Sequence, residues 1–305
     1  MSSRLKMTAR NAFWSYFSMF VSFGLQFISR TVFIYCLGEE YLGINGLFSN
    51  VLGVLSFAEL GIGTAINFCL YKPVAENNIE KIKSYMWYYK WAYRTIAVII
   101  TIIGLALIPF LNVLVKDPGN VGNIVIYYLI YLFNTVTTYF VSYKYSLVNA
   151  EQKNYIYTNL IISISTIIIQ VIALVIWKNF LIYLLVAAIF GVFQKIFICI
   201  YFNRLYPYLK EKNIEKLTKQ EKSILITKIK ALVIHKIGDV SVHQTDNIIV
   251  SAFVSTKMVG LLSNYNLFIS TVSSCINVLF NSVTGSLGNL VATESKEYQY
   301  IIFKR

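Results

Sequence analysis

Eight apolar runs, each long enough to cross a lipid bilayer, dominate this chain of 305 residues. A helix needs about 20 apolar residues to span the hydrocarbon core, because each residue advances it by about 1.5 Å. The runs are Ala12–Leu37, Leu47–Leu70, Tyr89–Val115, Ile124–Val148, Tyr157–Trp177, Phe180–Tyr201, Ile224–Val254 and Val259–Leu290. Within a bilayer the backbone must satisfy its own polar groups, so such runs form helices. The sequence therefore predicts an all-α, polytopic membrane bundle of about eight transmembrane helices.

The basic residues lie mainly on alternate connections between these runs. With the N-terminus placed in the cytoplasm, twenty of the 27 lysines and arginines fall on the cytoplasmic side, and only Lys116, Lys178 and Lys257 fall outside. Basic residues are enriched in the cytoplasmic connections of membrane proteins. We therefore predict that both ends of the chain are cytoplasmic. The net charge of +13 then reflects membrane topology, and no nucleic-acid partner is predicted.

Residue patterns typical of enzymes and metal sites are missing from the sequence. The four cysteines, Cys36, Cys69, Cys199 and Cys275, fall in different runs without CxxC spacing, which supports neither disulfides nor zinc. There is no Ser-His-Asp order and no glycine-rich phosphate loop. A membrane glycosyltransferase or polymerase is disfavoured, because the outer turn with Glu39 and Glu40 is too short for an active site. The sequence predicts no enzyme, no cofactor and no metal.

One long basic connection, residues 204–223, divides the chain. It separates a first lobe of six helices, residues 1–203, from the first two helices of a second lobe, residues 224–290. Residues 291–305 follow as a cytoplasmic tail. Within the connection Thr218 and Glu221 have the spacing of a capping box directly before an apolar run. We therefore expect the seventh helix to begin near Lys219.

A weak internal repeat agrees with this division. An offset of 217 positions places Leu42-Gly43 on Val259-Gly260, and it places Arg30 on Asn247, beside Asp246. Transporters are commonly built from repeated helix bundles.

The second run and the residue before it are unusual in carrying several glycines around Glu59, namely Gly46, Gly53, Gly61 and Gly63. Glycines in a membrane helix favour close packing, or they loosen the helix where a substrate passes.

The seventh run holds five polar or ionisable residues in an apolar setting: His235, Lys236, Asp239, His243 and Asp246. On one continuous helix four of them, all except Lys236, fall within an arc of about 80°. An ionisable group at the centre of a membrane costs about 2.5 kcal/mol or more, and such residues are functional candidates. We expect this stripe to line a wet or protein-filled cavity. A metal site is disfavoured, because zinc prefers a closed set of four ligands.

Three stretches carry a resemblance to a known family. They are CLGEEYLGINGLF at 36–48, LSFAELGIG at 55–63 and LYKP at 70–73. The pattern resembles the oligosaccharide flippases of bacterial surface-polysaccharide synthesis, the Wzx-type or polysaccharide transporter members of the multidrug/oligosaccharidyl-lipid/polysaccharide exporter superfamily. The resemblance implies two six-helix lobes around a central cavity, in the bacterial plasma membrane. It also implies export of a lipid-linked oligosaccharide, typically on undecaprenyl diphosphate, by alternating access, for O-antigen, lipopolysaccharide or capsule.

Members of that family usually have more spans than this chain, so the resemblance covers the first lobe and the opening of the second. We expect a truncated or split product, or a partner that supplies the remaining spans. The excess of basic groups along the spans favours an anionic substrate. The alternatives are a cation-coupled multidrug exporter of the same superfamily and a non-transporting remnant. The expected partners are the lipid-linked oligosaccharide, membrane lipids and other polysaccharide-assembly proteins.

Two groups of ionisable residues are predicted to carry this function. Cations suit a diphosphate head group, and the predicted substrate-binding residues are Arg30, Lys195, His235 and Lys236. Carboxylates and histidines often carry protons in transporters, and the predicted coupling or gating residues are Glu59, Asp239, His243 and Asp246.

Arg30 and Asp246 lie at comparable depths toward the outer side, on helices that would face one another across the lobes. An ion pair between them would close the outer gate, since breaking a buried pair is costly. A static structural pair is the alternative.

Overall fold

The computed structural model describes residues 2–55, 59, 62–115, 121–151, 156–211, 214–243, 245–293 and 295–304. Every regular element within these ranges is helical, and they contain no strand. The α-helices are α1 (Ser2–Leu37), α2 (Glu39–Leu55), α3 (Ile62–Ala75), α4 (Ile79–Ala106), α5 (Leu111–Leu114), α6 (Ile124–Ala150), α7 (Ile156–Trp177), α8 (Phe180–Leu205), α9 (Lys219–His243), α10 (Asp246–Phe253), α11 (Thr256–Thr293) and α12 (Lys296–Phe303). The short 3-10 elements are η2 (Ile108–Phe110) and η3 (Pro207–Lys210). The predicted all-α architecture is confirmed.

Several of these helices can cross a membrane by their length and composition. Among the described residues four qualify, namely Met19–Leu37 of α1, α4, residues 124–148 of α6, and α8, and residues 161–177 of α7 form a shorter apolar helix. These five segments match the first, third, fourth, sixth and fifth predicted runs in turn. The chain is therefore a multi-pass helical membrane protein, as its sequence predicts.

Two predicted spans differ from expectation because each is divided into two helices. The run Leu47–Leu70 falls on α2 and α3, with Glu59 between them. The run Ile224–Val254 falls on α9 and α10, and the break lies between His243 and Asp246. At the second break the Asp246 carboxylate lies in the first turn of α10, where the helix dipole stabilises a negative charge.

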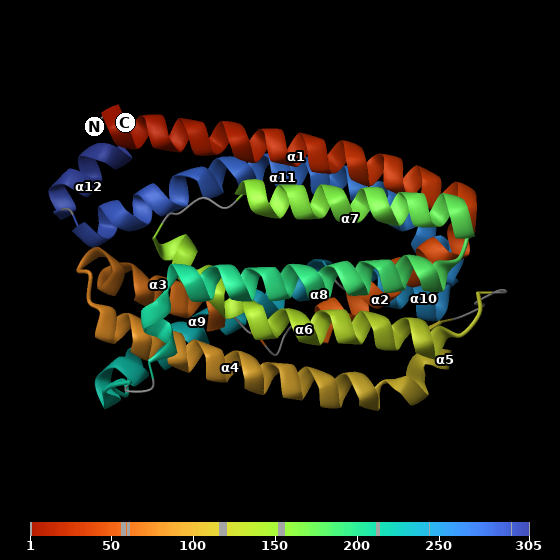
Figure 1. Cartoon of the computed structure of the whole chain (residues 1–305), viewed down its shortest axis with the longest axis horizontal. Coiled ribbons are helices and arrows are strands. Elements are labelled where there is room, and N and C mark those ends of the chain that lie inside the picture. The colour runs from red at the N-terminus through yellow and green to blue at the C-terminus, as the bar shows by residue number, and fades with distance from the viewer. Residues whose placement is uncertain are drawn as a thin grey trace.

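The long helices lie side by side along one axis, and their connections gather at two ends (Figure 1). One end holds the connections 75–79 and 206–218 and both chain termini, and we call it the basic end. The other end holds the turns at Gly38, at 178–179 and at 254–255, and we call it the short-loop end. Gly38 has a φ of 93°, which suits a residue without Cβ in the tight turn from α1 to α2.

Aromatic rings join the first helices to α8 near the short-loop end. Phe180, at the start of α8, is almost fully buried. Its ring centroid lies 5.8 Å from Phe33 of α1, 5.1 Å from Tyr41 of α2 and 4.8 Å from Tyr127 of α6. The contacts with Phe33 and Tyr127 are edge-to-face, a geometry that adds stability beyond the burial of apolar area. The cluster fixes α1, α2, α6 and α8 relative to one another at this end.

The long basic connection is folded against the start of α4 rather than free. Lys83 is 4% exposed, and its Nζ lies 2.9 Å from the Glu211 carboxylate. The Ser84 hydroxyl donates to the backbone carbonyl of Glu215 at 2.5 Å. Leu217 is buried. The connection is therefore a structured strap across the basic end.

The predicted capping box is confirmed at the end of this strap. The Thr218 amide donates to the Glu221 carboxylate at 2.8 Å, and the Glu221 amide donates back to the Thr218 hydroxyl at 3.3 Å. These bonds satisfy backbone donors that the first turn of a helix leaves free. Helix α9 accordingly begins at Lys219. The Glu221 carboxylate also lies 2.7 Å from Lys81 Nζ, which ties the new helix to α4.

This ion pair predicts a dependence of stability on pH. The hydrogen bond from Lys81, followed by those from Thr218, holds the pKa of Glu221 below its usual value. A carboxylate with a lowered folded-state pKa stabilises the fold above its unfolded pKa of about 4.3, and this contribution is lost as the pH falls through the folded-state value. We expect Glu221→Gln to lower the unfolding temperature at neutral pH, and the difference from wild type to vanish in acid. Thermal unfolding of the detergent-solubilised protein measures this difference.

Glu76→Gln is the matched control for that prediction. Within the described part of the chain, Glu76 makes a distant, exposed pair with Lys72 at 3.8 Å, and exposed pairs contribute little. Its substitution should leave the unfolding temperature nearly unchanged at every pH. A Glu221→Gln effect that is the same at neutral and acid pH would contradict the assignment.

Candidate functional site

The first and last parts of the chain meet where α2 crosses α11 at the short-loop end. A Cβ added to Gly43 would collide with the backbone carbonyl of Thr256. A Cβ added to Gly260 would lie 2.7 Å from the carbonyl oxygen of Glu39. Glycines at such a crossing let two helix backbones touch. Gly46, one of the glycines for which close packing or helix loosening was predicted, lies at the same crossing, where an added Cβ would be 3.5 Å from Val259.

The contacts at this crossing follow the sequence offset of 217. Under that offset Gly43 corresponds to Gly260, and Glu39 corresponds to Thr256. The approach of Gly43 to Thr256 is therefore the counterpart of the approach of Gly260 to Glu39. Reciprocal contacts between equivalent positions are the mark of a two-fold axis. The weak repeat seen in the sequence thus has a structural basis at this crossing.

Arg30 and its offset counterpart Asn247 take part in the same arrangement. Arg30 contacts Ser263 of α11, and Asn247 of α10 lies near Gly46 of α2, its Nδ2 3.9 Å from the place of a Cβ. Ser263 and Gly46 are themselves related by the offset. Asn247 is 4% exposed, and its Oδ1 has no hydrogen-bond partner among the residues that the structure describes. A buried, unpaired amide oxygen costs free energy, so this contact is not optimised for stability.

The guanidinium of Arg30 binds α11 rather than the predicted Asp246. Its Nε donates to Oδ1 of Asn264 at 2.5 Å, and another of its nitrogens donates to the Ser263 hydroxyl. Asp246 is exposed in the first turn of α10, and in the part of the chain that the structure describes no ion pair joins it to Arg30. The predicted Arg30–Asp246 pair is wrong, because the break after α9 moves Asp246 off the helix face assumed for it.

Most side chains of the polar stripe of the seventh run belong to α9. The side chains of His235, Lys236, Asp239 and His243 lie outside the described residues, so their predicted binding and coupling roles stay predictions. The backbone of all four belongs to α9, which ends at His243. The expected continuation of the stripe to Asp246 on one helix is wrong.

Glu59 lies between the two halves of the second span, beside a cluster of tyrosines. The Tyr93 hydroxyl donates to the Glu59 carboxylate, and the Tyr89 hydroxyl lies 3.1 Å from that of Tyr93. Both tyrosines belong to α4 and are almost fully buried. A Cβ on Gly63 of α3 would lie 2.6 Å from the Tyr89 hydroxyl and 2.7 Å from that of Tyr93. The sequence-predicted coupling residue is thus held at a helix break by a network that needs a glycine beside it.

Lys195 joins α8 to α6. Its Nζ donates to the Thr137 hydroxyl at 2.6 Å and to the backbone carbonyl of Asn134 at 3.1 Å. Both acceptors are uncharged, and Lys195 is half-buried. The predicted substrate-binding residues Lys195 and Arg30 therefore lie on different helix pairs, and the described contacts do not bring them together.

Sequence reasoning missed the partners of these ionisable residues. Ser263 is the offset counterpart of Gly46, so a residue-by-residue comparison of the two repeats could have singled it out. Tyr93 and Asn264 gave no such signal, because tyrosine and asparagine recur throughout the runs. Their roles depend on which helices pack together.

Comparison with known proteins places these features in a family. The sequence profile described as polysaccharide biosynthesis protein matches residues 8–284. A solved structure called protein A superposes with a TM-score of 0.70 at 13% sequence identity, and the match covers 98% of this chain and 68% of that chain. At this identity the likeness shows the fold alone. No curated protein matches the sequence.

Proposed function

Because this chain belongs to the polysaccharide biosynthesis protein family, whose members are membrane transporters, we propose that it flips a polyprenyl diphosphate-linked oligosaccharide across the bacterial plasma membrane by alternating access. The basic end would face the cytoplasm, where such a lipid is loaded, in agreement with the distribution of lysines and arginines. The product would supply surface polysaccharide such as capsule or O-antigen. No covalent chemistry on the substrate is required.

The observation that carries this proposal is the closed contact at the short-loop end. Alternating access requires two packed units that separate at one end while they stay closed at the other. Here α1 and α2 meet α10 and α11 through glycine contacts and through Arg30, with reciprocal geometry. Arg30 uses neutral partners, Ser263 and Asn264. Hydrogen bonds to neutral groups are weaker than a buried ion pair, so this gate can open at moderate cost.

The ionisable residues then divide into loading and coupling roles. Lys195, His235 and Lys236 would meet the diphosphate, for which a lysine provides a point charge. Glu59, Asp239 and His243 would carry the coupling ion. Asp246 would act at the outer mouth, where it is exposed.

Complementation tests the proposal directly. A bacterial strain that lacks its own oligosaccharide flippase should regain surface polysaccharide when this protein is produced. Restored resistance to cationic drugs without polysaccharide would favour the multidrug exporter instead. Failure in both assays, with the protein present in the membrane, would favour a non-transporting role.

Crosslinking the short-loop end tests alternating access. Glu39 and Lys257 face one another across the crossing, with 3.7 Å between carboxylate and ammonium. We expect the Glu39→Cys, Lys257→Cys pair, joined by a short cleavable thiol crosslinker, to lose transport and to regain it on cleavage, because a locked gate cannot release substrate. The assay is polysaccharide export in a background with the four native cysteines replaced.

The matched control for this experiment is Lys72→Cys with Glu76→Cys. These residues are paired at i and i+4 near the end of α3, so a crosslink there joins one segment to itself. Transport should survive it. Full transport with the short-loop end locked would contradict alternating access.

A further inference from the structure

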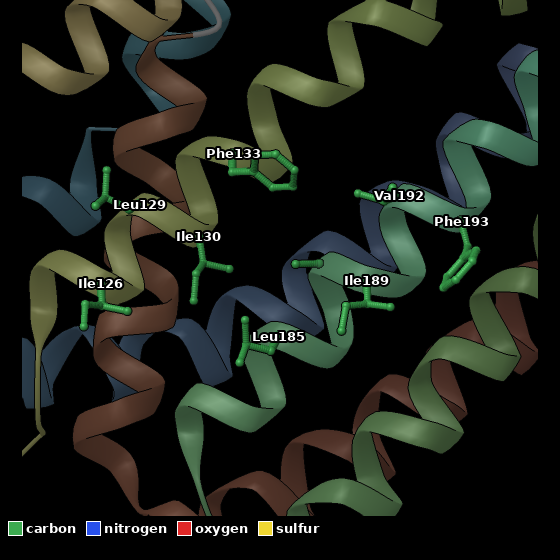
Figure 2. Close-up of a pocket in the computed structure, with 9 residues that line it drawn as sticks. Ile126, Leu129, Ile130, Phe133, Leu185, Ile189, Val192 and Phe193 are labelled. Carbon is green, nitrogen blue, oxygen red and sulfur yellow. The ribbon is translucent and has the colours of Figure 1, made fainter.

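An apolar groove runs along the outer face of the bundle between α6 and α8. It has a volume of about 610 Å³, within the range of small-molecule sites. Figure 2 shows the side chains of both helices that line it. They are Ile126, Leu129, Ile130 and Phe133 of α6 and Leu185, Ala188, Ile189, Val192 and Phe193 of α8. Ile189 is 52% exposed, so the groove is open along its length rather than enclosed.

The ammonium of Lys195 lies about one helical turn beyond one end of the groove. On α8 the lining positions recur every three or four residues up to Val192, and Lys195 continues that face. On α6 Thr137 continues the face of Phe133 in the same way. The hydrogen bond from Lys195 to Thr137, at 2.6 Å, therefore closes the groove at this end.

The position of this ammonium suits a phosphate only if the phosphate enters the membrane. Lys195 lies ten residues before Leu205, the end of α8, which corresponds to a depth of about 15 Å from the basic end. Its described partners are the neutral oxygens of Thr137 and Asn134. A phospholipid at rest keeps its head group at the membrane surface, about 15 Å from the midplane. A lipid in transit carries its phosphate past this depth.

We propose that the α6–α8 groove holds the apolar chain of a polyprenyl phosphate lipid, with its phosphate contacting Lys195. This inference rests on the proposed function. It adds the location of the substrate's polyprenyl chain during transport. One groove and one cation complement a lipid with one chain and one phosphate. An ordinary phospholipid has two chains and would leave the cation unused.

Binding of defined lipids to the purified full chain tests this assignment. Native mass spectrometry compares a long-chain polyprenyl monophosphate, the matching polyprenol without phosphate, and phosphatidylglycerol. Wild type should bind the polyprenyl monophosphate most tightly. Lys195→Met should weaken its binding about tenfold or more, as expected for the loss of a charged hydrogen bond, and leave polyprenol binding unchanged. Lys195→Arg should retain binding of the phosphate lipid.

A second variant tests the groove itself. Ile189→Trp fills the groove from an exposed position, so the fold should tolerate it, and it should weaken both polyprenyl lipids. Ile172→Trp is the control, because Ile172 of α7 is 50% exposed but does not line the groove. Unchanged polyprenyl phosphate binding in Ile189→Trp and Lys195→Met would overturn the proposal. Equal binding of phosphatidylglycerol by wild type would also overturn it.

Export assays separate this inference from the proposed function. If wild type and Ile189→Trp restore surface polysaccharide equally well, the flippase function stands. The groove is then not the path of the substrate's polyprenyl chain. If wild type restores nothing but binds polyprenyl monophosphate through the groove and Lys195, the groove assignment stands and the flippase proposal fails.

Discussion

Gly43→Ala is expected to abolish most transport while the protein still inserts into the membrane. The added Cβ would collide with the backbone carbonyl of Thr256, and a backbone atom cannot move away by changing rotamer. Overpacking of this kind costs about 3 kcal/mol, which would lower the ratio of closed to open states at the short-loop end about a hundredfold. Polysaccharide export measures the loss, and the yield of the Glu39→Cys, Lys257→Cys crosslink measures the closed state.

Gly24→Ala is the matched control for Gly43→Ala. Gly24 lies in α1, and a Cβ placed there would meet no atom within 4 Å. The Gly24→Ala variant should export polysaccharide like wild type, and it should form the Glu39→Cys, Lys257→Cys crosslink in the same yield. Gly260→Ala should behave like Gly43→Ala, because its Cβ would approach the Glu39 carbonyl oxygen to 2.7 Å. Normal export by both Gly43→Ala and Gly260→Ala would show that the close crossing is not needed for the cycle.

Glu59→Gln is expected to reduce transport at least about tenfold with little loss of stability. The amide oxygen of glutamine can still accept the hydrogen bond from Tyr93, so the buried network stays satisfied. What the variant loses is the carboxylate, the group that could bind and release a proton or cation. Export assays and thermal unfolding, measured on the same preparation, separate the two effects.

Gly63→Ala, in contrast to Glu59→Gln, is expected to lower the stability of the protein. Its Cβ would lie within 3.0 Å of Glu59 and even closer to the hydroxyls of Tyr89 and Tyr93. Because those rings are buried, we expect a loss of about 2 kcal/mol in stability. Gly191→Ala, whose nearest contact would be an ordinary 3.5 Å from Asn134, should be stable. If Glu59→Gln exports like wild type, the carboxylate has no coupling role and Glu59 serves only the packing of the second span.

Local signals in the sequence predicted local features well. The long apolar runs predicted membrane helices, because a membrane forces the backbone to bond within itself. The spacing of Thr218 and Glu221 predicted the start of α9 at Lys219, since a capping box is formed by residues of one turn. The offset of 217 predicted which glycines correspond, and the crossing of α2 and α11 brings them together.

Predictions failed where they assumed that an apolar run is one straight helix. The Arg30–Asp246 pair and the stripe that ended at Asp246 both depended on a continuous helix through Ile224–Val254. The backbone breaks after His243, so the helical phase that placed Asp246 is lost there. Assigning residues to helix faces at a fixed angle of about 100° per residue assumes a continuous helix, so it cannot predict such a break.

The sequence by itself determined that this chain is a helical membrane protein, that α9 begins at Lys219, and which glycines correspond in a weak repeat. Those properties follow from composition and from spacings of a few residues, or from the likeness of two segments. Only the tertiary structure decided the partners of its ionisable residues: Ser263 and Asn264 for Arg30, Tyr93 for Glu59, and Thr137 for Lys195. Most of these pairs join residues many positions apart, and which of them meet depends on how helices pack and where they break.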